Sequence, residues 1–207
     1  MSGSNSKEVK GEEEKEKVNK SWEELGLLEV LRESCESMGW KSATKIQEEV
    51  LPWALKGRDV IGLAETGSGK TGAFSLPILQ GLLENSSKRR GGGVQALVLA
   101  PTRELAVQIQ ECMVALQGSM GASIVAIVGG MDMSPQAIAL ARNPHVVVAT
   151  PGRLVDHLTH TKGFHLRQVQ YLVLDEADRM LSMDFEEELH QILEQNLLCR
   201  PNQNFHR

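Results

Sequence analysis

A glycine-rich segment, AETGSGKT at residues 64–71, has the residue types and spacing of a phosphate-binding loop. Gly67 and Gly69 allow the backbone to bend so that successive N–H groups converge on an anion. Lys70 is placed to bind the terminal phosphates of a nucleotide, and the Thr71 hydroxyl to ligate Mg²⁺. A stretch with helical spacing follows, so the positive end of a helix faces the same anion. The alternative is a flexible turn with a solvent-exposed lysine. The predicted cofactor-binding residues of this loop are Ala64, Glu65, Thr66, Gly67, Ser68, Gly69, Lys70 and Thr71.

A second set of chemically capable residues is DEAD at 175–178, directly after an apolar run. Ligands of open α/β sheets bind at the carboxyl ends of the strands, so Asp175 and Glu176 are expected beside the glycine-rich loop. Asp175 can hold Mg²⁺ through water, and Glu176 can deprotonate the water that attacks the γ-phosphate. Alone, this acidic turn fits a solvated helix cap equally well. Together with the loop, it predicts Lys70, Asp175 and Glu176 as catalytic residues, with Thr71 and Asp175 at the metal.

The elements that position these residues follow from the spacing of apolar side chains. Continuous apolar runs are typical of strands covered on both faces, as in a parallel sheet. They predict strands at 60–63, 94–100, 123–128, 145–150 and 170–174. Helical spacing predicts helices at 21–38, 44–56, 71–83, 103–117, 135–142, 152–160 and 185–197. This alternation predicts a three-layer α/β domain with a mostly parallel central sheet.

Composition limits the remaining possibilities. The 207 residues suffice for one α/β domain, predicted at 21–207, and a disordered charged tail at 1–20. Residues 85–93 are predicted to form a mobile surface loop. The net charge of −5 gives no global basic field for nucleic acid. Scattered cysteines and the lack of a long apolar run favour an intracellular protein without a membrane span.

Five short motifs occur in an order that resembles the DEAD-box RNA helicases: AETGSGKT, PTREL at 101–105, GG at 129–130, TPGR at 150–153 and DEAD. The resemblance implies an ATP-dependent RNA-remodelling enzyme with two RecA-like lobes, of which this chain is the N-terminal one. It implies ATP and Mg²⁺ as cofactors and RNA as a partner, bound without sequence preference. The stretch GLAETGSGKTGAFSLPIL is most similar to the nucleolar subgroup that matures small-subunit ribosomal RNA. That similarity implies a nuclear or nucleolar location, with the cytoplasm as the alternative, and pre-ribosomal particles as partners.

The segment ATKIQ at 43–47 resembles the adenine-recognition motif of that family. By this resemblance Gln47 reads the adenine edge, and the upstream Trp22 stacks on the ring. Trp40 also stands where the family has Phe, and Ala43 where it has Pro. The pattern T-x-x-Q is itself a capping box, so the alternative is that Gln47 satisfies backbone donors.

Two of the motifs, PTREL and TPGR, begin where a predicted strand ends and a helix starts. Helix N-termini offer unpaired N–H groups to phosphate, and a glycine pair allows close approach of a backbone. The alternative is ordinary loop capping with solvated arginines. The predicted RNA-binding residues, which resemble the RNA-binding face of the family, are Pro101, Thr102, Arg103, Gly129, Gly130, Thr150, Pro151, Gly152 and Arg153. His157, His160 and His165 are predicted to be solvated rather than metal ligands, because no further ligand has suitable spacing.

The family continues past this point into a strand ending in Ser-Ala-Thr and a second lobe with arginine fingers. We therefore expect a domain that is incomplete at its C-terminus and nearly inactive as an ATPase alone, since such an arginine contributes roughly 10³–10⁵ in rate. A naturally short, non-catalytic nucleotide- or RNA-binding module is the alternative. A different phosphate-loop NTPase is disfavoured, because it would not combine PTREL, TPGR and DEAD.

Overall fold

The computed structural model describes residues 20–85 and 93–198, with side chains described as far as residue 194. The predicted tail at 1–20 lies outside these ranges except for Lys20. Most of the predicted surface loop at 85–93 also lies outside them. Both therefore stay predictions.

Four parallel strands form the central sheet, in the order β2-β3-β1-β4. Each spans four residues and begins and ends inside a predicted run: β1 is Ala96–Leu99, β2 is Ile124–Ile127, β3 is Val146–Ala149 and β4 is Tyr171–Leu174. Their last residues lie in register, with Leu99 opposite both Ala149 and Leu174, and Ile127 opposite Ala149. The four segments that follow the strands therefore leave the sheet at the same edge, which is where the predicted motifs begin.

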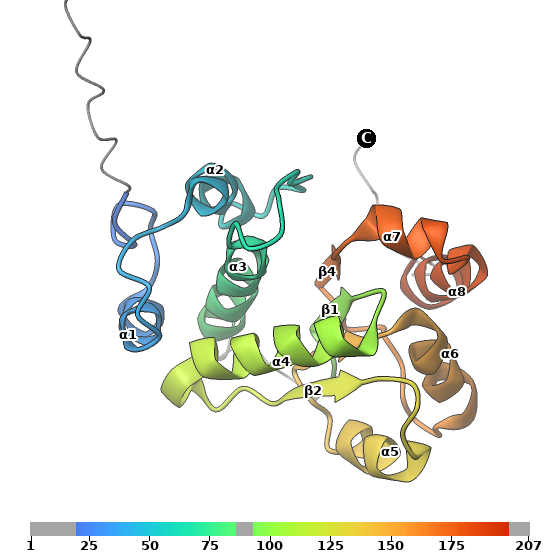
Figure 1. Ribbon diagram of the computed structural model, residues 1–207. Coiled ribbons are helices and arrows are strands. Elements are labelled where there is room, and N and C mark those ends of the chain that lie inside the picture. The colour runs from blue at the N-terminus through green and yellow to red at the C-terminus, as the bar shows by residue number, and fades with distance from the viewer. Residues whose placement is uncertain (1–19, 86–92, 199–207) are drawn as a thin grey trace, which may run out of the picture.

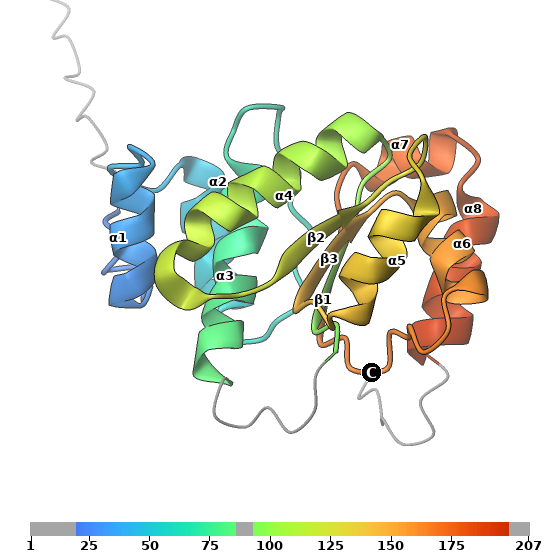
Figure 2. The same cartoon turned by 90° about the horizontal axis from the view of Figure 1, so that it is seen from below.

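Helices cover both faces of the sheet, which confirms the predicted three-layer arrangement (Figure 2). On one side lie α1 (Glu29–Ser37), α2 (Lys45–Ala54), α3 (Lys70–Glu84) and α4 (Arg103–Gln117). On the other lie α5 (Met133–Ala141), α6 (Pro151–His160), α7 (Ala177–Ser182) and α8 (Glu186–His190). Within the described ranges, no helix is long and apolar enough to cross a membrane.

The strands supply alternate residues to two hydrophobic cores. In β1, Ala96 and Val98 face the core under α1–α4, whereas Leu97 and Leu99 face the core under α5–α8. All four are fully buried. Burial on both faces explains why the strands read as continuous apolar runs rather than alternating ones.

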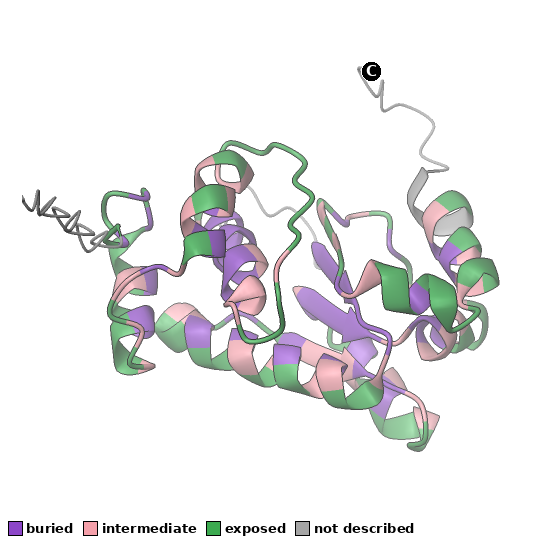
Figure 3. Cartoon of the chain, turned by 45° about the horizontal axis from the view of Figure 1, so that its top comes forward, coloured by how far each residue is buried: buried purple, intermediate pink, exposed green. Residues whose placement is uncertain are grey.

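The predicted strand at 60–63 is absent from the structure, and that prediction is wrong for this conformation. These residues form an extended, exposed segment between α2 and α3 (Figure 3), with Ile61 93% and Leu63 91% exposed. A strand exists only when its backbone groups pair with a neighbour. Among the described residues, β4 pairs only with β1, so its outer edge is open and no neighbour receives residues 60–63.

Two further differences concern helices. The predicted helix at 21–38 is split: Ser21 and Glu24 form the expected reciprocal capping bonds, but the backbone turns at Gly26 (φ +83°) and α1 starts at Glu29. Burial of Trp22, Leu25 and Leu27 is achieved by this turn rather than by one continuous helix. In addition, α7 was not predicted, because its six residues are too few for a clear periodic pattern.

A glycine on α3 makes room for the first residue of β4. A Cβ atom at Gly81 would lie 1.9 Å from Tyr171 Oη and 2.6 Å from Cζ of the same ring. Tyr171 packs against the core under α1–α4 and links the helix that starts with Lys70 to the strand that ends before Asp175. The missing Cβ of Gly81 therefore allows this contact.

His157 is fully buried, contrary to the prediction of a solvated histidine. Its Nδ1 lies 2.8 Å from Thr161 Oγ1, while its Nε2 is buried and lacks a hydrogen-bond partner among the described residues. Burial and the positive charge of Arg153 lower the pKa of His157, and Asp156 opposes this shift. His157 is thus a neutral core residue, whereas His160 and His165 are exposed as predicted. No group of metal-ligating side chains occurs among the described residues.

We predict that Gly81→Ala destabilises the fold, even though alanine is more favourable than glycine inside a helix by about 1 kcal/mol. Overpacking against Tyr171 should reduce the free energy of unfolding by about 1–3 kcal/mol, measured by urea denaturation. Gly152→Ala is the matched control, since the nearest atom to its Cβ position is 3.9 Å away. In a Tyr171→Leu background, the Gly81→Ala penalty should disappear; an unchanged penalty there would contradict the proposed clash.

A second prediction concerns pH. Because its folded pKa lies below the ordinary value of 6.5, His157 binds its proton more readily in the unfolded state. Stability contributed by neutral His157 is therefore lost as pH falls below about 6.5. Denaturation of His157→Leu between neutral and mildly acidic pH should show a weaker loss of stability than the unmutated chain. The exposed His160→Ala variant should keep the original pH dependence.

Candidate functional site

The glycine-rich loop leads directly into α3 in the way the sequence predicts. Gly67 (φ +83°) and Gly69 (φ +95°) both adopt the left-handed conformation, which is strained for other residues. Gly69 is the residue that precedes the helix, and Lys70 is its first residue. The unpaired N–H groups of the first turn of α3 are therefore presented at the loop.

Lys70 and Asp175 lie near each other, on the end of the loop and the end of β4 respectively. Asp175 is buried, with 9% of its surface exposed. Burial and the Glu176 carboxylate raise the pKa of Asp175, whereas the nearby Lys70 ammonium group lowers it. Burial is the main cause of the raised pKa, and a divalent cation beside this carboxylate would oppose it.

Glu176 has an unusual backbone conformation that starts α7. Its φ of +52° is left-handed, which few residues other than glycine adopt. Its N–H donates to Asp175 Oδ1 at 3.1 Å, and its own Oε2 pairs with Arg179 Nη1 at 3.1 Å. The Glu176 carboxylate is partly exposed and is held by a residue one turn further along, a partner that sequence reasoning missed.

Gln47 is both a capping residue and a neighbour of the phosphate loop. Its Oε1 accepts a hydrogen bond from the Thr44 N–H at 2.8 Å, as the capping-box reading requires. Its Nε2 donates to the Gly69 carbonyl at 3.0 Å, and the side chain is 2% exposed. A Cβ atom at Gly72 would lie 2.6 Å from this Nε2. These bonds match the capping alternative, because the buried carboxamide joins the start of α2 to the start of α3; the reading of an adenine edge by Gln47 stays a prediction.

The two tryptophans differ in accessibility. Trp22 is 3% exposed, lies in the core under α1–α4, and donates its indole N–H to the Trp40 carbonyl at 2.8 Å. Its ring is therefore not free to stack on a base, against the prediction. Trp40 is partly exposed, and its ring lies 2.8 Å from the Cβ position of Gly72, beside Gln47. Trp40 is therefore the aromatic side chain that packs against the first turn of α3. Its position seven residues before Gln47 is the sequence feature that could have indicated this.

The residues present suit a nucleotide phosphate with Mg²⁺. Ser68 Oγ in the loop is buried and has no hydrogen-bond partner among the described residues, so a polar ligand would satisfy it. Lys70 Nζ donates to the carbonyl of Ala64 within the same loop. Thr71 and Asp175 provide the oxygen ligands that Mg²⁺ prefers. The loop thus offers hydrogen-bond donors to an anion, and the Asp175 carboxylate is suited to bind a cation.

The predicted RNA-binding motifs are joined by hydrogen bonds at the carboxyl ends of β1, β2 and β3. Arg103 Nη1 donates to the Gly130 carbonyl at 3.5 Å, and Arg153 Nη1 donates to the Met131 carbonyl at 2.7 Å. Arg153 also pairs with Asp156 at 3.4 Å, and its side chain is only 12% exposed. Arg103 is exposed, as the alternative reading expects. Arg153 instead bonds the loop at residues 129–131 and is mostly buried, so it is not a solvated arginine.

Local capping also occurs in these motifs, as the alternative reading expects. Thr102 caps α4 by accepting the Leu105 N–H at 3.3 Å, and Thr150 precedes α6 with Pro151 in its first turn. Beside Gly129 nothing lies within 4 Å of the Cβ position, so the backbone there is open to a close approach. Capping and phosphate binding do not exclude each other, because a capped helix start still presents free N–H groups.

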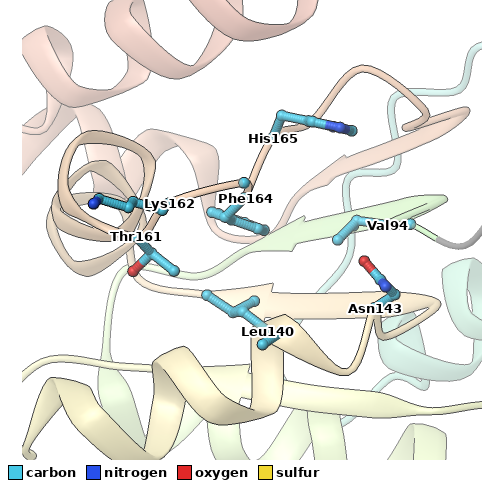
Figure 4. Close-up of a pocket in the computed structure, with 10 residues that line it drawn as sticks. Val94, Leu140, Asn143, Thr161, Lys162, Phe164 and His165 are labelled. Carbon is cyan, nitrogen blue, oxygen red and sulfur yellow. The ribbon is translucent and has the colours of Figure 1, made fainter.

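A separate cavity of about 230 Å³ lies away from all these motifs (Figure 4). Residues before β1, after α5 and after α6 line it, including Val94, Asn143 and Phe164. It contains none of the predicted site residues and none of their hydrogen-bond partners. The chemistry-bearing residues therefore lie on an open edge of the domain rather than in this cavity.

Comparison with known proteins agrees with the geometry. The sequence profile described as DEAD/DEAH box helicase matches residues 44–205. The "Probable ATP-dependent RNA helicase DDX47" of Mus musculus is 57% identical over 178 residues, which cover 86% of this chain and 38% of the mouse protein. The "ATP-dependent rRNA helicase rrp3" of Aspergillus niger is 59% identical over 175 residues, or 84% of this chain and 36% of that protein. The chain thus spans little more than a third of these relatives.

A solved structure shares the fold. The crystal structure of a DEAD box protein from the hyperthermophile Methanococcus jannaschii has a TM-score of 0.76 and 36% identity to this chain. The similarity covers 84% of this chain and 46% of that one. The fold is therefore that of a RecA-like helicase domain. Because the profile match spans the phosphate loop, the arginine motifs and the acidic pair together, this chain belongs to the DEAD/DEAH box helicase family.

Proposed function

We propose that this chain is the ATP-binding N-terminal lobe of an ATP-dependent RNA helicase whose second lobe completes the enzyme. One observation carries the proposal: Asp175, Arg103 and the Gly-Gly pair follow strands that end in register, and the charge of Lys70 reaches Asp175. Nucleotide and RNA sites would then share one edge of the sheet. The relatives described above are named as an ATP-dependent RNA helicase and an ATP-dependent rRNA helicase, which supports the same function.

The residues of this chain would divide the work of ATP hydrolysis. When bound, Mg-ATP supplies the phosphoanhydride that is cleaved. The loop N–H groups and Lys70 bind and orient the phosphates, Thr71 and Asp175 hold the Mg²⁺ ion, and Glu176 removes a proton from the attacking water. In this conformation Lys70 also donates to the Ala64 carbonyl, and Glu176 uses Oε2 to pair with Arg179. An arginine from the second lobe would add roughly 10³–10⁵ in rate.

Adenine recognition is proposed for Gln47 together with Trp40. Gln47 has one donor and one acceptor at the start of α3, and Trp40 lies beside it with part of its ring exposed. Trp22 would act indirectly, by fixing the Trp40 backbone through its indole N–H. This assignment replaces the stacking role that the sequence predicts for Trp22.

The RNA would lie along the loops that carry the predicted RNA-binding residues, held by its sugar–phosphate backbone rather than by its bases. The relative named as an rRNA helicase supports ribosomal RNA precursors as the substrate, a nuclear or nucleolar location, and pre-ribosomal particles as partners. A short, non-catalytic nucleotide-binding module is the second candidate. RNA-stimulated ATP hydrolysis by the protein that joins this chain to a second lobe distinguishes the two.

We predict that Trp40→Ala weakens ATP binding more than Trp22→Phe, which removes only the indole N–H that fixes the Trp40 backbone. Loss of base stacking costs about 1–3 kcal/mol, or roughly 5- to 150-fold in Kd. Calorimetric titration of the chain with Mg-ATP measures both variants, with inorganic triphosphate as the base-free control. Normal ATP affinity in Trp40→Ala would return the stacking role to another side chain.

In the two-lobed protein, Glu176→Gln should reduce the RNA-stimulated ATPase rate by about 10²–10⁴ while ATP and RNA still bind, because only the base is removed. Arg179→Ala is the control, since it frees the Glu176 carboxylate without removing it. A Glu176→Gln variant that keeps more than about a tenth of the rate would show that Glu176 is not the base.

A further inference from the structure

The strand β2 lies at the edge of the sheet, beside α5 (Figures 1 and 2). In a parallel strand, the backbone N–H and C=O groups of successive residues point alternately to the two sides. The Ser123 and Ile127 carbonyls point to β3, where they accept from Val146 and Thr150 at 3.1 Å. The backbone groups of Ile124 and Val128 therefore point away from the sheet, where no further strand lies among the described residues.

Gln136 on α5 takes the place of a neighbouring strand at Val128. Its Oε1 accepts from the Val128 N–H at 3.0 Å, and its Nε2 donates to the Val128 carbonyl at 3.0 Å. Val128 is 2% and Gln136 7% exposed, so both bonds are shielded from water. The same Nε2 lies 3.4 Å from the Asp132 carbonyl. One carboxamide thus ties together the two residues that flank the loop 129–131.

The rest of that loop is held from other elements. Arg103 from α4 binds the Gly130 carbonyl, and Arg153 from α6 binds the Met131 carbonyl. Gly130 has a φ of +71°, and a Cβ atom there would lie 3.4 Å from Arg103 Nη1. The loop at residues 129–131 is therefore held by three side chains, and Gln136 bonds the two residues that flank it.

We infer that Gln136 is a positioning residue for RNA: it fixes the Gly129–Gly130 backbone in the shape that the sugar–phosphate chain of RNA contacts. The inference rests on the proposed RNA-binding function, but Gln136 itself is buried and does not touch RNA. A loop that is not held in place must lose conformational entropy when a ligand binds to it, which weakens binding. Releasing the glycine pair should therefore weaken RNA binding without changing the nucleotide site.

The chain contains a matched control on the same edge strand. Gln110 on α4 donates its Nε2 to the Ile124 carbonyl at 3.3 Å, another outward-facing position on this edge. Ile124 is at the opposite end of the strand from the Gly-Gly pair. A residue that only stabilises the edge should behave like Gln110, whereas a residue that positions RNA contacts should differ from it.

The experiment compares Gln136→Leu, Gln136→Met and Gln110→Leu in the 207-residue chain. A fluorescent oligouridylate at low salt reports RNA affinity, calorimetry reports Mg-ADP affinity, and urea denaturation reports stability. Hydrogen exchange of the peptide containing residues 129–131 reports the shape of the loop without RNA. Both Gln136 variants should raise the RNA Kd by at least about tenfold, or about 1.4 kcal/mol, and speed loop exchange to a similar extent. Mg-ADP affinity should stay within about twofold.

Gln110→Leu should lose comparable stability yet keep normal RNA affinity and slow exchange in the loop. Equal effects of the Gln110 and Gln136 variants on RNA would overturn the inference, as would normal loop exchange in both Gln136 variants. If the unmutated chain binds no RNA, the proposed function of this face fails. In that case loop exchange still decides whether Gln136 fixes the loop.

Discussion

The geometry of the nucleotide site depends on how α3 is held, because this helix presents Lys70 as its first residue. No strand anchors it, since residues 60–63 are exposed. Its apolar side chains Leu76, Ile78, Leu79 and Leu82 pack into the core under α1–α4, and two close contacts at glycines add to this packing. Gln47 and Trp40 approach its first turns where Gly72 lacks a Cβ atom, and Tyr171 approaches its last turns at Gly81. Glycine is unfavourable inside a helix by about 1 kcal/mol, so its presence at both contacts reflects close packing rather than flexibility.

Elements that depend on the order of neighbouring residues were predictable from the sequence. Elements that depend on contacts with distant residues were not. The glycine-rich loop, the acidic turn and the four paired strands follow from short patterns of glycine, charge and apolar residues. Residues 60–63 have the same apolar pattern, but a strand also needs a partner, which lies far away in sequence. Trp22 and His157 are buried by the turn at Gly26 and by helices packed across α6, and neither contact leaves a local signal.

The two edges of the sheet are treated differently. At β2, glutamine side chains from α4 and α5 bond the Ile124 carbonyl and both backbone groups of Val128, so further strand pairing is blocked at these two positions. At β4, Leu172 and Leu174 are 40% and 38% exposed. Among the described residues, no glutamine side chain bonds the outer backbone groups of this strand. Among the described residues, the β2 edge of the sheet is therefore partly covered by side chains, whereas the β4 edge is open.

Several groups proposed to act on the nucleotide already have hydrogen-bond partners within the chain. Lys70 holds the Ala64 carbonyl, Gln47 holds the Gly69 carbonyl, and Glu176 holds Arg179. An arriving nucleotide must compete with these internal bonds, so the apparent affinity is lower than the contacts alone would give. The same competition acts as a threshold. A ligand that replaces one bond would gain little, whereas one that reaches the proposed base, phosphate and metal positions together would replace them all, so the proposed site would favour a whole nucleotide over free phosphate.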